Sequence, residues 1–313
     1  MQEGRWFKKG EFMSNYSDII SAEHYNSLMT NNHLYIQTSD SYIARVIGDI
    51  AKNGAKEIIE IGCGPARITG LIAKTNGINL TAVDIDDSYI EYAKIKLKDQ
   101  NISIVKSDIC TYKHAKPVDV FYSQGVHHHL PKGEITKKYL QNVYSQLKPG
   151  GVYIISDEFV PEYTSAEGRE KRLVVWYSHV IANALKNNYT YLATEEAKTL
   201  LDDIYEGRVK KNVKNKQMID FILSIAPVIN SAASASDKAR MDELVSKCLL
   251  DLELFNDVHQ DTAKEIALSR GDYKVCDSVF AKEVGEVGFK VLSSKSFGPI
   301  YDVGAMVVYI LGK

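Results

Sequence analysis

The sequence predicts a protein of the α/β class, with a doubly wound, mostly parallel sheet and a helical cap insertion. Three observations support this fold. Short β-type runs alternate with helical segments up to about residue 160, the alternation then stops, and it resumes after Gly271. Alternation of this kind is typical of parallel βαβ units. The interruption, on the order of a hundred residues, has the size of a small domain.

The N-terminal part of the chain is predicted to be helical. Residues 14–37 are aromatic and polar and favour one or two short helices. Ser39 or Asp40 can cap a further amphipathic helix, because short polar side chains accept hydrogen bonds from the first free N–H groups. We therefore expect an N-terminal helical segment over residues 1–40, followed by an α/β core over residues 41–160.

Within the core, strands and helices follow one another at regular spacing. The β-type runs cover residues 57–61, 80–84, 102–106, 118–122 and 152–156. The helical segments between them cover residues 68–74, 88–98 and 132–147. Right-handed crossovers place the carboxyl ends of parallel strands at one edge of the sheet, which is where ligands bind in such folds.

Residues 161–270 are predicted to form the helical cap, because helical periodicity dominates there and no strand signal interrupts it. The α/β pattern then returns over residues 271–313 and completes the core. Its elements are a helix at 278–287 and strands at 288–292 and 304–311. The sheet is thus predicted to have seven strands.

The composition argues against several classes of protein. Lys and Arg number 38 and Asp and Glu number 40, which gives a formal net charge of −2, without the basic excess of a typical nucleic-acid binder. No run approaches the ~20 apolar residues of a membrane helix, and the four cysteines form no C-x-x-C pair. We expect a cytoplasmic protein with no nucleic-acid or membrane partner, and a homodimer is compatible with the sequence.

A glycine-rich motif between the first strand and the following helix is the strongest functional signal. It reads Glu60-Ile61-Gly62-Cys63-Gly64-Pro65-Ala66, and its two glycines permit a tight turn and a close approach of the backbone to a ligand. The second strand ends in Asp84, about 20 residues after the first glycine. A carboxylate at that place can accept both ribose hydroxyls of an adenosine.

The charge of Glu60 distinguishes between two adenosine cofactors. A dinucleotide would place its pyrophosphate at the glycine turn, where a carboxylate repels it strongly at low dielectric. The third glycine of the dinucleotide fingerprint is also missing, since position 67 is Arg67. A sulfonium and an α-ammonium would instead be attracted, so the motif favours S-adenosylmethionine over NAD.

The ordered motifs resemble those of the class I S-adenosylmethionine-dependent methyltransferases. The run E-I-G-C-G-P-A is followed by V-D-I-D, S-D-I, S-Q-G-V-H-H-H-L and L-K-P-G-G, from about residue 57 to 158, with a weaker echo after Gly271. The resemblance implies a Rossmann-like sheet, S-adenosyl-L-methionine as cofactor, and methyl transfer to a small-molecule acceptor by in-line displacement.

The resemblance also implies roles for residues around the cofactor. Those at its methionine end are Glu60, Gly62, Cys63 and Gly64. Those at its ribose and adenine are Asp84, Ile85, Asp108 and Ile109. Those that run past the sulfonium are Ser123, Gln124 and Gly125. Each has a structural alternative: Asp84 and Asp108 could serve only as caps in their loops, and Cys63 is expected to be small filler rather than a reactive thiol.

Candidate bases follow the fourth and fifth strands. His128 and His129 are favoured, because an unperturbed histidine has a pKa near 6.5 and adjacent histidines oppose each other's protonation. The alternatives are Glu158, which follows the fifth strand, and His179, which lies in the predicted cap. The histidines could also only shape the pocket and leave catalysis to positioning. Three consecutive histidines do not easily converge on one ion, so no metal site is predicted.

Other functions stay open at this point. An RNA or protein methyltransferase would share the scaffold, although S-Q-G-V after the fourth strand differs from the Asn/Asp-Pro-Pro-aromatic motif of enzymes that methylate exocyclic or amide nitrogens. An NAD-linked oxidoreductase is the candidate from another class, and Glu60 argues against it. The acceptor atom is open among oxygen, nitrogen, carbon and sulfur, because these chemistries share one fold.

Overall fold

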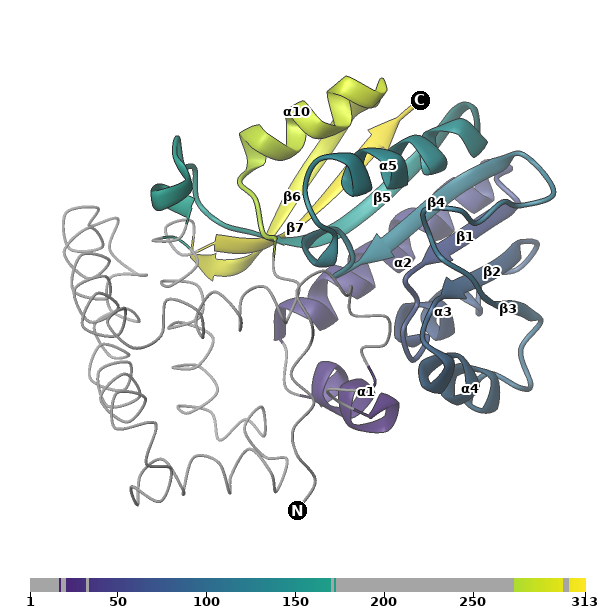
Figure 1. Ribbon diagram of the computed structural model, residues 1–313. Helices are drawn as coiled ribbons and strands as arrows, with labels where there is room; N and C mark the ends of the chain where they lie inside the picture. The colour runs from purple at the N-terminus through teal and green to yellow at the C-terminus, as the bar shows by residue number, and fades with distance from the viewer. Residues whose placement is uncertain (1–16, 18–20, 32–33, 170–171, 173–272, 301–303) are drawn as a thin grey trace, which may run out of the picture.

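The fold is a single seven-stranded sheet with helices on both faces (Figure 1). The computed structural model describes residues 17, 21–31, 34–169, 172, 273–300 and 304–313. The strands are β1 (Glu57–Ile61), β2 (Asn79–Asp84), β3 (Ile102–Lys106), β4 (Val118–Gln124), β5 (Leu147–Phe159), β6 (Lys290–Ile300) and β7 (Gly304–Gly312). They lie in the order β3-β2-β1-β4-β5-β7-β6.

The strand directions confirm the predicted doubly wound, mostly parallel, Rossmann-like sheet. Strands β1 to β5 pair in parallel with one another, whereas β7 runs antiparallel to both β5 and β6. The chain winds outward from β1 to β3 and then returns to the other side of β1 with β4. Doubly wound folds bind their ligands at such a reversal, which here lies at the carboxyl ends of β1 and β4.

Two hydrophobic layers hold the helices against the sheet. The helices are α1 (Ala22–Asn31), α2 (Leu34–Lys52), α3 (Arg67–Ile72), α4 (Asp87–Lys96), α5 (Glu134–Gln146) and α10 (Asp277–Val287). Helices α5 and α10 cover one face through buried residues such as Tyr139 and Phe280. Helices α2 and α3 cover the other face through residues such as Ile43 and Ile72. Both layers are built from the apolar stripes of the predicted helices.

The start of α2 differs from the prediction. The helix begins at Leu34 and runs through Ser39 and Asp40, which are buried within it and do not cap it. Their side chains are engaged with Gln124 and Arg67 instead. A domain boundary between residues 40 and 41 would fall inside this helix.

Strand β5 is longer than predicted at both ends. It begins at Leu147, which pairs with Val118, so the predicted turn around Gly150 (φ 76°) lies within the strand's bounds. At the other end β7 pairs with it as far as Phe159. Residues 157 and 158, predicted to follow the strand, are therefore held on it.

The predicted helical cap lies mostly outside the described residues. Of residues 161–270, the structure describes only 161–169 and 172, so the cap and its limits stay a prediction. Among the described helices, none is long and apolar enough to cross a membrane.

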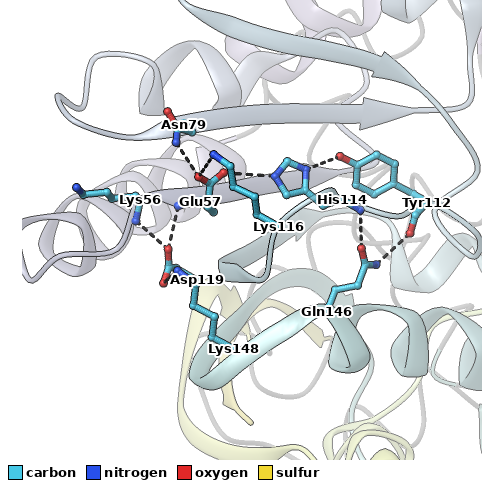
Figure 2. A network of polar contacts seen from close by, with 9 residues as sticks. All are labelled: Lys56, Glu57, Asn79, Tyr112, His114, Lys116, Asp119, Gln146 and Lys148. Atoms are coloured by element: carbon cyan, nitrogen blue, oxygen red, sulfur yellow. Dashed lines mark hydrogen bonds and ion pairs between the residues drawn. The ribbon is translucent and has the colours of Figure 1, made fainter.

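A polar network fastens the sheet at the amino end of β1, opposite the ligand edge (Figure 2). Glu57, which is buried, accepts hydrogen bonds from Asn79 Nδ2 (2.7 Å), Lys116 Nζ (3.0 Å) and His114 Nε2 (3.3 Å). Burial by itself raises the pKa of Glu57, but these three partners outweigh it and lower the pKa.

Asp119 is a second carboxylate in this network. Its carboxylate accepts the backbone N–H groups of Lys56 (3.0 Å) and Glu57 (2.9 Å) and the ammonium of Lys148 (2.7 Å). The start of β4, the start of β1 and the start of β5 are thereby joined by charged hydrogen bonds, which are stronger than neutral ones.

We predict that Glu57→Gln lowers the free energy of unfolding by about 1–3 kcal/mol at neutral pH, because charged hydrogen bonds become neutral. The pKa of Glu57 is lowered on folding, so its contribution is present above the ordinary range of glutamate and is lost as the pH falls through the lowered value. Urea unfolding at neutral pH and near pH 3.5 checks this. Asp99→Asn, at an exposed position, is the control, and an equal loss at both pH values would contradict the prediction.

Candidate cofactor and active site

The glycine motif forms a tight turn between β1 and α3 at the sheet reversal. Gly62 has φ 67°, and a Cβ atom on it would come within 2.3 Å of Val126 Cγ2. Gly64 has φ 51°. Only glycine adopts such angles without strain and leaves room for the neighbouring side chain. The backbone N–H of Cys63 donates to the carbonyl of Val83 (3.0 Å), which ties the turn to β2.

Glu60 lies just before this turn and is almost completely buried, with 3% of its surface exposed. Its Oε2 accepts hydrogen bonds from the hydroxyls of Tyr122 (2.7 Å) and Thr69. Both donors are neutral, so they do not balance a negative charge. Burial therefore dominates and, with a smaller contribution from Asp84, raises the pKa of Glu60 to about 7. A cationic ligand would supply the missing charge.

Asp84 ends β2 beside the glycine turn, as predicted. Its Oδ2 accepts the N–H of Gly64 (2.7 Å) and its Oδ1 accepts the N–H of Asp86 (2.9 Å). Each carboxylate oxygen can accept a second hydrogen bond, so the side chain fixes the turn and can still hold hydroxyls. Burial raises the pKa of Asp84. Ile85, next in sequence, is 44% exposed, an apolar surface suited to a flat ring.

The third strand ends in a compact turn that contains Asp108 and Ile109. Asp108 is exposed, and its Oδ1 accepts the N–H of Cys110 (2.7 Å). The carboxylate thus caps its own turn, the alternative weighed for it. Ile109 packs against the hydrophobic layer beneath α5. The adenine contact of both residues stays a prediction.

The three residues predicted to pass the sulfonium have different surroundings. Ser123 is fully buried, and its hydroxyl bonds with that of Tyr153 (2.6 Å) in the core, so only its backbone can serve the site. Gln124 donates from Nε2 to Ser39 Oγ (3.1 Å) and accepts from Arg67. Gly125 (φ 65°) continues the strand edge, with its N–H bonded to the carbonyl of Ser156 (2.9 Å).

Arg67 was noted in the sequence only because it replaces a glycine. Its guanidinium pairs with the buried Asp40 of α2 and donates to Gln124 of β4. Burial lowers the pKa of Arg67 to about 10. This buried cluster joins α2, the start of α3 and the end of β4. No local sequence signal identifies it, because its members come from three distant segments.

A histidine–carboxylate pair lies after β4 and β5. His128 Nδ1 donates to Asp157 Oδ1 (2.5 Å), and Asp157 also accepts the N–H groups of His127 (2.7 Å) and Glu158 (2.7 Å). Gly125 is next to the imidazole, since a Cβ atom on this glycine would lie 3.8 Å from His128 Cε1. The pair therefore sits beside the strand end that carries the predicted sulfonium contacts.

The proton affinity of His128 differs from the expectation. Burial lowers the pKa of His128, but the charge of Asp157 and its hydrogen bond outweigh burial and raise the pKa. Burial likewise raises the pKa of Asp157, and His128 more than reverses that, so the pKa of Asp157 is lowered. Repulsion between adjacent histidines does not predict the direction of the pKa shift of His128, because a buried carboxylate, Asp157, is in direct contact with its ring.

The other base candidates have different partners. Glu158 forms an ion pair with the buried Lys274 (3.0 Å), and the ring of His129 lies against that of His128, tilted by 45°, with 3.9 Å between centroids. His127 bonds through Nε2 to Glu283 of α10 (2.8 Å), a contact that the sequence did not reveal. His179 lies outside the described residues.

The described residues suit S-adenosylmethionine better than a metal ion. Within the described part of the chain, no three His, Cys, Asp or Glu side chains are placed to hold a metal ion. The sheet edge at this reversal suits S-adenosylmethionine better: Glu60 lacks a cationic partner among its hydrogen bonds, the turn carries no side chain of its own at Gly62, and Ile85 is an exposed apolar residue beside Asp84.

Comparisons with known proteins point to one family. Residues 58–151 match the family described as "Methyltransferase domain". The chain is 32% identical over 97 residues to trans-aconitate 2-methyltransferase of Agrobacterium fabrum, covering 31% of this chain and 36% of that protein. It is 29% identical over 158 residues to malonyl-[acyl-carrier protein] O-methyltransferase of Priestia megaterium, covering 48% of this chain and 54% of that protein. These matches span at most about half of either relative.

The fold has a counterpart among solved structures. N-methyltransferase NodS from Bradyrhizobium japonicum, in complex with S-adenosyl-L-homocysteine, aligns over 96% of this chain and 98% of its own, with a TM-score of 0.52 and 10% identity. At this identity the likeness shows a shared fold and nothing about the acceptor.

We predict that Glu60→Gln flattens the pH dependence of stability between about pH 4.5 and pH 7. The pKa of Glu60 is raised on folding, so the folded state binds the proton more tightly, and the free energy of unfolding falls as the pH rises through this window. The variant should be more stable than the wild type at pH 8, by up to about 3 kcal/mol at 1.4 kcal/mol per unit.

Urea unfolding at several pH values checks this prediction. Glu57→Gln, three residues away on the same strand, is the matched control, because its effect has the opposite dependence on pH. A Glu60→Gln variant that keeps the wild-type slope would show that this carboxyl is not the group responsible.

Proposed function

We propose that this chain, whose α/β core is a class I S-adenosylmethionine-dependent methyltransferase domain, transfers a methyl group to a small-molecule acceptor by in-line displacement. The single observation that carries the proposal is the buried Glu60, which has only neutral hydrogen-bond donors and stands at the glycine turn. An anion placed there suits a sulfonium cofactor and disfavours the dinucleotide of the NAD-linked alternative.

The residues that would hold the cofactor lie along the carboxyl ends of β1 to β4. Glu60 and the turn from Gly62 to Gly64 would take its methionine end, and Asp84 with Ile85 would take the ribose and adenine. Asp108 and Ile109 would bound the adenine from the next strand. When bound, S-adenosylmethionine supplies the methyl group as an electrophile.

Support for a small acceptor comes from charge and from one relative. The chain has a formal net charge of −2, which gives no general attraction for a nucleic acid. One partial relative is named for trans-aconitate, a small organic acid. The acceptor atom is not fixed by either observation.

For an acceptor that must lose a proton, His128 is the base that the geometry favours. Its Nδ1 is held by Asp157, so Nε2 is the nitrogen that would accept the proton. Asp157 would stabilise the imidazolium that forms and keep the ring in one orientation, the arrangement of a base with its orienting group. Glu158 is less suited because it already balances Lys274. His129 and His179 remain alternatives.

We predict that Asp84→Asn weakens binding of S-adenosylhomocysteine at least about 10-fold, because a charge-assisted bond pair to the ribose is lost. Calorimetry, with thermal unfolding to show that the variant is folded, measures this. Asp87→Asn, on an exposed residue of α4, is the matched control. Wild-type protein that binds NAD and not S-adenosylhomocysteine would refute the proposed function.

We predict that His128→Gln lowers turnover about 100-fold or more with a hydroxyl or amine acceptor, the usual contribution of a general base. Release of S-adenosylhomocysteine, measured over a panel of hydroxyl, amine and carboxylate compounds, reports turnover. Binding of S-adenosylhomocysteine should not change. Glu158→Gln should retain more activity than His128→Gln.

The comparison with His129→Gln decides which histidine acts. If His129→Gln loses activity and His128→Gln does not, the base is His129. If both retain near-normal turnover, neither of these two histidines is the base. If Glu158→Gln and His179→Gln retain it as well, positioning alone accounts for the catalysis.

A further inference from the structure

Two short segments, which lie in sequence on either side of residues 170–272, are joined to each other beside β5. We call Val160–Arg169 the outgoing limb and Tyr273–Ser278 the returning limb. The N–H of Val160 donates to the carbonyl of Val275 (3.1 Å), and Arg169 Nε donates to the carbonyl of Lys274 (2.8 Å). Glu162 accepts both the N–H (2.9 Å) and the hydroxyl (2.5 Å) of Ser278.

The returning limb also contacts the candidate base. The N–H of Tyr273 donates to the carbonyl of His128 at 2.5 Å. Lys274 follows, with 3% of its side chain exposed and its Nζ 3.0 Å from Glu158 Oε2. Glu158 is adjacent in sequence to Asp157, which holds the ring of His128. One backbone bond and one ion pair therefore attach this limb to the two residues that flank the base.

The ion pair allows Lys274 to remain charged in the interior. A buried ammonium without a partner is strongly disfavoured, whereas one that contacts a carboxylate is retained. An ammonium fixed next to an imidazole opposes its protonation, because like charges repel at low dielectric. The charge of Lys274 lowers the pKa of His128, and the contacts of Lys274 with Glu158 and of Tyr273 with His128 hold the ammonium near the imidazole.

Among the described residues, charges around His128 come from β5, from the returning limb and from the loop of the histidine itself. Strand β5 contributes Asp157 and Glu158, which raise the pKa of His128, and the returning limb contributes Lys274, which lowers it. The loop of the histidine itself contributes the neighbouring rings of His127 and His129. Beyond them, Glu283 and Lys132 are engaged at His127.

We propose that Lys274 is a positioning residue for His128, acting through its charge and through the backbone contact of Tyr273. The returning limb, and not β5 alone, then sets how readily His128 takes a proton. The role of His128 as a base rests on the proposed function, whereas the coupling between the two side chains does not depend on it.

A titration of His128 by NMR tests the coupling directly, with the full chain and with labelled histidine, assigned through His128→Gln. In Lys274→Gln the pKa of His128 should rise by about 1 pH unit, the usual effect of one nearby charge. Gln keeps a hydrogen-bond donor for Glu158, which favours folding. Lys274→Arg should restore the wild-type value, and Lys282→Gln, at an exposed lysine of α10, should leave it unchanged.

A second pair of variants tests the proposal if Lys274→Gln does not fold. If Lys274→Gln is unfolded, the double variant Lys274→Met/Glu158→Gln is compared with Glu158→Gln alone, and the pKa of His128 should be higher in the double variant. An unchanged pKa of His128 in folded Lys274→Gln, or an equal pKa in the second pair, overturns the proposal.

The titration separates this proposal from the proposed function. It uses no acceptor and no cofactor, so a shift in the pKa of His128 stands even if no compound is methylated. Conversely, if methylation is found and the titration does not shift, the proposed function holds and Lys274 has a structural role only.

Discussion

The ligand edge is built around Glu60, a buried carboxyl group whose side-chain hydrogen-bond donors are neutral hydroxyls. Glu57 and Glu60 are three residues apart on β1, and both are buried. Glu57 is met by Lys116, Asn79 and His114, and its pKa is lowered. Glu60 is met by two hydroxyls, and its pKa is raised to about 7. The charge of Glu57, at one end of the strand, is therefore balanced by Lys116. The hydrogen bonds of Glu60, at the other end, bring no positive charge, so a positively charged ligand would be favoured there.

The surroundings of Glu60 preserve this imbalance. Arg67 begins the helix that follows the glycine turn, yet its guanidinium is neutralised by Asp40. Thr69 and Tyr122 orient the carboxyl through hydroxyl groups, which satisfy its hydrogen bonds and leave its charge unbalanced. A buried carboxyl group whose hydrogen bonds are satisfied does not prevent the protein from folding. If its charge is not balanced, it still favours a nearby cation.

Sequence patterns were sufficient for what depends on neighbours in the chain. All seven strands and the core helices follow from local periodicity, and Glu60, Gly62 and Asp84 lie at the strand ends where the motifs placed them. Contacts across the chain were not visible. Ser39 bonds to Gln124, 85 positions away, so it is buried inside α2 and not a cap. Ser123 faces the core, because alternate residues of a buried strand face opposite layers.

The proton affinity of His128 was mispredicted for the same reason. Its nearest neighbours in sequence are histidines, but its decisive neighbour is Asp157, 29 positions away on β5. Asp157 is held in place because antiparallel β7 pairs with β5 past the expected strand end, up to Phe159 and Ala305.

The extension of β5 matters for the base proposed here, His128, because a strand fixes a side chain more tightly than a loop does. A base that works by geometry must keep its orientation within narrow limits, and orienting groups on rigid elements achieve this best. Asp157 and Glu158 are consecutive residues of one paired strand. The first orients His128 and the second anchors Lys274. The same two strand positions thus determine both the direction of the imidazole and the charge that faces it.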